Sequence, residues 1–61
     1  MITPEECRLR RAALGLTQEQ LAALAGLHVR TVASFEGERA SPRHTTAMAV
    51  LRALRAAEAA A

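Results

Sequence analysis

Apolar residues recur along this 61-residue chain at intervals of three and four positions, and residues that start or stop helices divide the pattern into segments. Such spacing puts the apolar side chains on one face of a helix. The segments cover about residues 4–14, 17–25 and 28–36, with a last one from about residue 45 onwards. We therefore predict a single all-α domain over residues 1–61, built as a compact bundle of four or five short helices.

The first expected helix begins with a capping box, in which the side chains of Thr3 and Glu6 satisfy backbone amides and Pro4 takes the first helical position. Gly15 is expected to end this helix as a left-handed cap. Three residues share its inward face: Cys7, Arg11 and Leu14. The buried stripe therefore contains an arginine, and a buried arginine needs a carboxylate partner.

A second capping box, formed by Thr17 and Gln20, opens the next helix, and Gly26 stops it. The predicted apolar face of this helix consists of Leu21, Leu24 and Ala25. The third helix has three predicted inward anchors: Leu27, Val32 and Phe35. Because only a short glycine-containing turn joins these two helices, they are expected to cross at a steep angle.

The segment 38–44 is interpreted as a loop that contains Pro42, and the last helix is expected to begin near Thr45 or Thr46. Its apolar stripe consists of Ala47, Val50, Leu51 and Leu54. Residues 56–61 favour a helix but have little to bury, so this end is expected to fray.

The composition indicates a fold held by packing alone. Hydrophobic residues make up 51% of the chain, but many are alanine and the only aromatic residue is Phe35, which is typical of closely packed helices. The single cysteine, Cys7, excludes a disulfide within the chain and is expected to be a small buried apolar residue. The possible soft ligands Cys7, His28 and His44 lack the spacing of a zinc site, so no metal or cofactor is expected.

The charged residues are all arginine or glutamate, and they give a net charge of +2 and a pI of about 10.0. This balance favours a polyanionic partner such as nucleic acid. A solvated, arginine-rich surface explains the same numbers, so the charge alone leaves both interpretations open.

Several functional classes are disfavoured by the residues present. We expect no enzyme, because the chain offers no serine or cysteine paired with a base, no glycine-rich phosphate loop and no paired carboxylates in a plausible pocket. No apolar run approaches the roughly 20 residues of a membrane span. The acidic start at residues 1–6 is unlike a signal peptide, so a cytoplasmic location is expected.

The middle of the chain carries a recognisable pattern. Residues 11–27 read Arg-x-x-x-Gly-Leu-Thr-Gln-Glu-Gln-Leu-Ala-x-x-Ala-Gly-Leu, residues 31–36 read Thr-Val-x-x-Phe-Glu, and Pro42 follows. This pattern resembles the lambda-repressor/Cro-like (XRE-type) helix-turn-helix family of bacterial and phage DNA-binding proteins, over about residues 7–54. The resemblance implies a helix-turn-helix at about 17–36 and a sequence-specific, double-stranded-DNA-binding transcriptional regulator that acts as a repressor.

The outward face of the third helix is the expected reading surface. With its three anchors inward, the exposed residues should be His28, Val29, Arg30, Ala33 and Ser34. The fork of Arg30 suits O6 and N7 of guanine, and Val29 suits a thymine methyl group. A histidine is a poor N-cap, so His28 either weakens the start of this helix or serves DNA contact.

The resemblance assigns roles to individual residues. It implies base contacts by Val29, Arg30, Ser34 and His28, phosphate contacts by Gln18, Thr31 and Arg43, and a structural ion pair between Arg11 and Glu36. The alternative interpretation of Gln18 and of Arg30 is that each is a solvated helix residue without a DNA contact.

The chain departs from the family pattern in two places. Gly37 directly follows Glu36, and Glu38 stands where glycine is expected, so the exit of the third helix is expected to be rebuilt. The fifth helix that supplies the dimer contact in many relatives is expected to be missing from these residues. We still expect a homodimer on an inverted repeat, through the Met48 side of the last helix or the C-terminal turn.

The alternative function is an antitoxin-like interaction module that binds a protein such as a toxin through apolar residues, for which Leu9, Val29 and Met48 are candidates.

Overall fold

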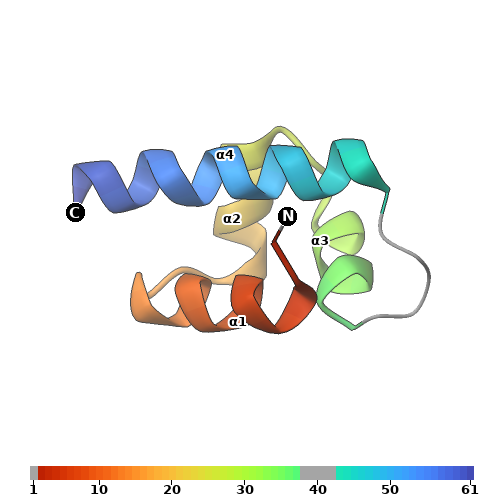
Figure 1. The fold of residues 1–61 in the computed structure, drawn as a ribbon, viewed down its shortest axis with the longest axis horizontal. Helices are drawn as coiled ribbons and strands as arrows, with labels where there is room; N and C mark the ends of the chain where they lie inside the picture. Colours follow the sequence, from red (N-terminus) through yellow and green to blue (C-terminus); the bar gives the residue numbers. More distant parts are fainter. Residues whose placement is uncertain (1, 38–42) are drawn as a thin grey trace.

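The computed structural model describes residues 2–37 and 43–61, and its described residues form helices without any strand (Figure 1). The helices are α1 (Pro4–Ala13), α2 (Gln18–Ala25), α3 (Val29–Glu36) and α4 (His44–Ala60). The prediction of an all-α bundle is confirmed. The predicted loop around Pro42 and the position of Glu38 lie outside the described residues.

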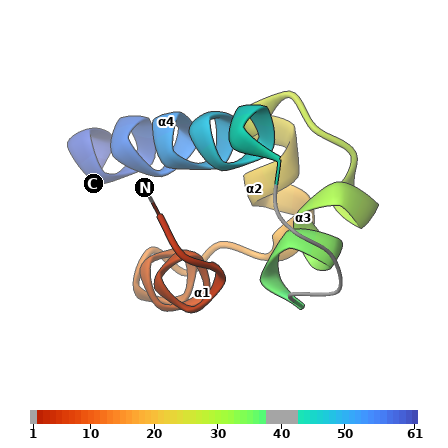
Figure 2. The same ribbon diagram turned by 45° about the vertical axis from the view of Figure 1, so that its right-hand side comes forward.

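α4 is the longest helix, and it runs along one side of the molecule, with α1 on the opposite side and α2 and α3 between them (Figures 1 and 2). The described part of the chain measures 31 × 20 × 17 Å along its principal axes. This arrangement leaves α3 at one end of the bundle, where one of its faces packs inward and the other faces solvent.

Local sequence signals account for the helix boundaries around α2. The Thr17 hydroxyl accepts a hydrogen bond from the Gln20 backbone N–H at 3.0 Å, and the Gln20 side chain accepts one from the Thr17 N–H at 2.8 Å, which completes the predicted capping box. Gly15 and Gly26 have φ values of 70° and 69° and stop α1 and α2 in the left-handed region. The backbone N–H of Leu16, after Gly15, then donates to the Arg11 carbonyl at 3.1 Å.

The start of α1 differs from the prediction in one respect. The Thr3 hydroxyl accepts from the Glu6 N–H at 3.1 Å, but in the described residues the Glu6 carboxylate does not complete the capping box. It lies 3.6 Å from the Arg10 guanidinium instead. A glutamate four residues before an arginine on one helix face favours such a pair.

The core is small and mostly aliphatic, as the composition indicated, with Phe35 as its aromatic member. Its buried hydrophobic residues are Ile2, Cys7, Leu21, Ala22, Val32, Phe35, Ala47, Val50, Ala53 and Leu54. The prediction that Leu24 faces inward is wrong, because 57% of its surface is exposed and Ala22 is buried instead. The inward face of α2 is therefore formed by Leu21 and Ala22, with Ala25 half-buried beside them.

Val29 and the start of α4 also correct the sequence prediction. Val29 was expected to face outward, but it is half-buried and packs against the core, because it stands one helical turn before the buried Val32. α4 begins at His44, slightly before the expected start, and remains helical to Ala60 where fraying was expected.

A contact with α1 accompanies this continuation of α4. Glu58 accepts two hydrogen bonds from Arg10, at 2.8 Å from Nε and 2.6 Å from Nη2. The expectation of fraying stays a prediction, and the bidentate ion pair gives the last turns of α4 a polar contact with α1 that apolar burial alone does not predict.

Candidate nucleic-acid interface

The solvent face of α3 carries one long cationic side chain surrounded by small residues. Arg30, Ala33 and Ser34 are exposed, whereas Val32, Phe35 and Glu36 on the opposite side are buried. Arg30 and Ser34 are four residues apart and therefore lie on the same side of the helix, with Ala33 beside them. The helix backbone can approach a partner closely along this face because Ala33 and Ser34 are small.

The N-terminus of α3 is capped by the residue that the sequence analysis considered a poor cap. Nδ1 of His28 accepts a hydrogen bond from the Arg30 backbone N–H at 3.0 Å. With Nδ1 used as the acceptor in this bond, Nε2 is the ring nitrogen left for another partner. The structure thus gives His28 a structural role, and its base contact stays a prediction.

The other predicted contact residues differ in exposure. Thr31 is half-buried, like Val29, and Arg43 is exposed at the residue before α4. The half-burial of Val29 leaves less of its surface for a thymine methyl group than the sequence analysis assumed. The assignments of Thr31 and Arg43 to phosphates remain predictions.

Glu36, the last residue of α3, is a buried carboxylate with only 2% of its surface exposed. Arg11 of α1 donates to it twice, from Nε to Oε2 at 2.8 Å and from Nη2 to Oε1 at 3.0 Å. Nη1 of Arg11 also donates to the Leu16 carbonyl at 2.8 Å. The inward arginine of α1 therefore has the carboxylate partner that its position requires.

Two further side chains reach the same carboxylate. Nε2 of Gln18 in α2 donates to Glu36 Oε1 at 3.0 Å, and the Cys7 thiol in α1 donates to Oε2 at 3.3 Å. We call Cys7, Arg11, Gln18 and Glu36 the Glu36 cluster. The bonds from Cys7 and Gln18 were not predicted, although Cys7 and Arg11 stand four residues apart on the inward face of α1, a spacing that points both side chains the same way.

The protonation states in the Glu36 cluster follow from these contacts. Burial alone raises the pKa of Glu36, but the hydrogen bonds from Arg11, Gln18 and Cys7 outweigh it and hold the pKa below its ordinary value. The pKa of Cys7 is raised to about 12, first by burial, and then by the hydrogen bond to Glu36 and the negative charge of the Glu36 carboxylate. At neutral pH the carboxylate is therefore charged and the thiol keeps the proton that it donates.

Arg8 adds a contact from α1 to the backbone of α3. Its Nη1 donates to the Glu36 carbonyl at the C-terminal end of the helix. A cation is favourable at this end, where helix carbonyls lack partners within the helix. The contact was not predicted, and it adds to the side-chain bonds that hold the end of α3 against α1.

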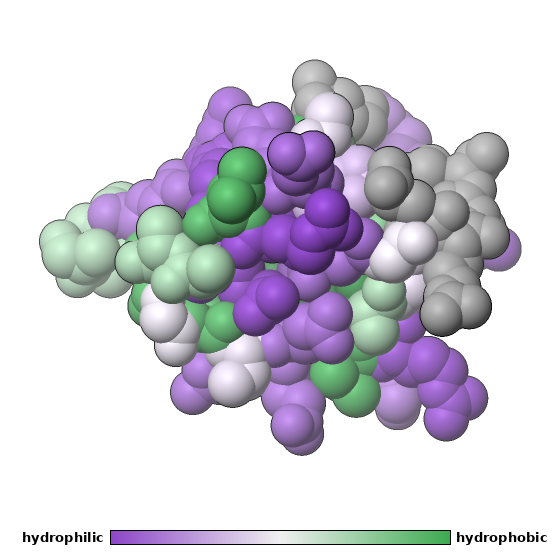
Figure 3. Space-filling model, turned by 90° about the horizontal axis from the view of Figure 1, so that it is seen from below, coloured by the Kyte–Doolittle hydropathy of each residue, from purple (hydrophilic) through white to green (hydrophobic). Residues whose placement is uncertain are grey.

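The view from below shows a largely hydrophilic surface with separate hydrophobic patches (Figure 3).

The described residues contain no group of three or more histidine, cysteine or acidic side chains that could hold a metal ion. Within the same residues, no helix has both the length and the apolar character needed to cross a membrane.

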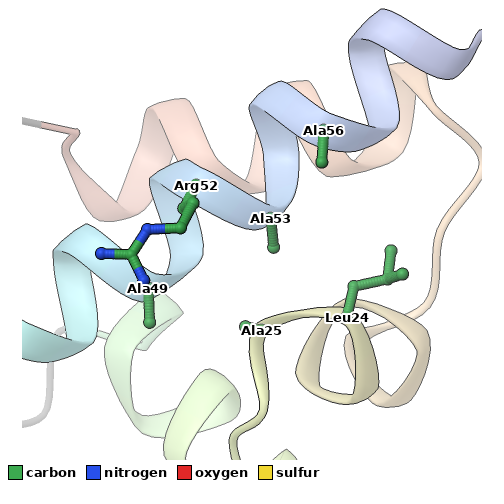
Figure 4. Close-up of a pocket in the computed structure, with 6 residues that line it drawn as sticks. All are labelled: Leu24, Ala25, Ala49, Arg52, Ala53 and Ala56. Atoms are coloured by element: carbon green, nitrogen blue, oxygen red, sulfur yellow. The ribbon is translucent and has the colours of Figure 1, made fainter.

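A shallow groove of about 280 Å³ lies between α2 and α4, on another part of the surface (Figure 4). It is lined by Leu24, Ala25, Ala49, Arg52, Ala53 and Ala56. Alanines line most of it, so the exposed Leu24 is its largest apolar side chain.

A family profile described as Helix-turn-helix matches residues 8–58, most of the chain. The chain belongs to the helix-turn-helix family. The type is XRE or lambda-repressor-like, which confirms the resemblance seen in the sequence. A search of curated proteins gave no match. For a helix-turn-helix protein of this type, the family supports DNA binding and a regulatory role, and α2 and α3 are the helices that span the predicted helix-turn-helix segment.

Proposed function

We propose that this helix-turn-helix protein is a sequence-specific regulator that places α3 in the major groove of double-stranded DNA and represses transcription by occluding polymerase. The observation that carries the proposal is the two-sided character of α3. One face is anchored in the core through Val32 and Phe35, and the other presents Arg30 to solvent among small residues. A major groove about 12 Å wide admits a helix presented in this way.

The proposed base contacts are centred on Arg30. Its guanidinium can donate two parallel hydrogen bonds to O6 and N7 of a guanine, and Ser34 lies one turn further along the same face. His28 and Val29 flank this centre, as donor and apolar neighbour respectively. Gln18, Thr31 and Arg43 are the proposed phosphate contacts.

We further propose that two copies act together on an inverted repeat. A single domain of this size makes few contacts, and two half-sites one helical turn apart, about 34 Å, would supply the missing affinity and specificity. Met48 on α4, which is 38% exposed, and the C-terminal turn of α4 are the candidate dimer surfaces.

The first experiment is the selection of binding sites from a random duplex pool, followed by affinity measurements with Arg30→Ala. The matched control is Arg52→Ala, which removes the same charge from an exposed position on α4. We expect Arg30→Ala to relax the preference at a guanine position, whereas Arg52→Ala keeps the selected sequence. An equal loss of affinity for all sequences with Arg30→Ala would make Arg30 a phosphate anchor and contradict its role as a base reader.

The second candidate function is a module that binds a protein such as a toxin. The exposed surfaces of Leu9 (64%) and Leu24 (57%), together with the groove beside Leu24, favour it. Salt dependence separates the two functions, because DNA binding weakens steeply with salt and an apolar protein contact does not.

A further inference from the structure

The side chain of Gln18 is already held before any DNA is present. Gln18 is the first residue of α2, and one hydrogen of its Nε2 is donated to Glu36 Oε1 at 3.0 Å. A side-chain amide nitrogen carries two hydrogens, so the second remains for another acceptor. The side chain is half-buried, which restricts the rotamers that it can adopt.

Glu36 is itself fixed from several directions. Its Oε2 accepts from Arg11 Nε and the Cys7 thiol, and its Oε1 accepts from Arg11 Nη2 and Gln18. Arg8 also binds its backbone carbonyl. A carboxylate with two donors on each oxygen and 2% exposure cannot rotate without breaking several bonds at once.

We propose that Glu36 is a positioning residue for DNA binding, which fixes the Gln18 amide so that its second N–H is presented to a DNA phosphate at the start of α2. The inference rests on the proposed function. Because Glu36 ends α3, the same bond sets the phosphate contact of α2 relative to the base-reading face of α3. A side chain that is already ordered also loses less conformational entropy when it binds.

The opposite effect is physically possible and defines the test. If Glu36 sequestered the Gln18 amide, the bond would have to break before phosphate could bind, and removal of Glu36 would tighten DNA binding. The bond would then act as an inhibitory contact.

The experiment is a double-mutant cycle on DNA affinity with a duplex selected by the wild-type protein. Gln18→Met is measured in the wild-type background and in Arg11→Met/Glu36→Leu. Replacing both members of a buried ion pair by apolar residues is often neutral or stabilising, so this background is expected to fold, as circular dichroism will show. We expect Gln18→Met to weaken binding about fivefold in the wild type and less than about twofold in the background, the size of one hydrogen bond.

A matched control is available in the second arginine–glutamate pair. Arg10→Met/Glu6→Leu also removes one charge of each sign, and this pair lies on α1 without touching α2. We expect the full fivefold cost of Gln18→Met in the control background. A duplex with a neutral methylphosphonate in place of the contacted phosphate should remove the difference in affinity between the protein with Gln18 and the Gln18→Met variant.

The outcomes separate this inference from the proposed function. Wild-type protein that selects no duplex contradicts the proposed function. Wild-type binding with the same cost of Gln18→Met in all three backgrounds overturns the positioning role, and so does tighter binding by Arg11→Met/Glu36→Leu. Side-chain amide resonances of Gln18 in the free protein give a second readout. They should show an ordered amide in the wild type and a mobile one in that double variant.

Discussion

Replacement of Arg11 alone should destabilise the fold far more than replacement of Arg11 and Glu36 together. Arg11→Met removes two bonds to the Glu36 carboxylate and one to the Leu16 carbonyl, and leaves a charge with 2% exposure to which, among the described residues, Gln18 and Cys7 still donate. Breaking a buried ion pair in this way costs about 3–5 kcal/mol.

This cost is large for a chain of this size. At about 0.05–0.15 kcal/mol per residue, 61 residues give a total stability of roughly 3–9 kcal/mol. Each kcal/mol corresponds to about 4–8 °C in Tm for a domain of this length, so Arg11→Met should lower Tm by at least about 12 °C. Arg11→Met/Glu36→Leu should recover most of this loss, because the unpaired charge is gone.

Thermal and urea unfolding followed by circular dichroism provide the assay. Arg10→Met is the control, since it breaks an exposed pair and should change Tm only slightly. A Tm for Arg11→Met within about 3 °C of the wild type would refute the reasoning, because it would mean that water reaches Glu36 and solvates its charge.

Three further predictions concern acid stability, thiol reactivity and the helix stops. The folded pKa of Glu36 lies below its unfolded value of about 4.3, so the charged carboxylate stabilises the fold above that value, and this stabilisation is lost as the pH falls through the folded pKa. Tm should therefore drop below about pH 4, and it should drop less steeply in Arg11→Met/Glu36→Leu. Cys7 is fully buried with a pKa of about 12, so a disulfide reagent at pH 8 should label it only in denaturant; equal rates with and without denaturant would contradict this. Gly15→Ala should lower the free energy of unfolding in urea by about 1–2 kcal/mol because φ is 70°, whereas Gly37→Ala, at φ −81°, should be tolerated. Similar losses for the two variants would show that the positive φ of Gly15 does not decide the cost.

The parts of the fold that the sequence predicted depend on neighbours in the chain. Thr17 and Gln20 satisfy each other's backbone groups across three residues, and Gly15 and Gly26 stop helices through their own φ angles. Such signals can be recognised without knowing what the helix packs against.

The corrected parts depend on tertiary partners. Leu24 and Ala22 both fit an apolar face of an eight-residue helix, and only the approach of another helix decides which is buried. Glu58 meets Arg10 across 48 positions, and periodicity carries no information on such a pair. Gln18 was correctly placed at the start of α2, but its bond to Glu36 requires the relative position of two helices.

The Glu36 cluster determines the smallest part of this protein that can be transferred to another scaffold. The buried carboxylate at the end of α3 takes its donors from as far back as Cys7, 29 positions earlier. A fragment restricted to α2 and α3 would lack Arg11 and leave the Glu36 carboxylate at its C-terminal end without a guanidinium partner. Grafting α3 into another scaffold therefore requires α1 as well, or a host that supplies its own guanidinium at the same place.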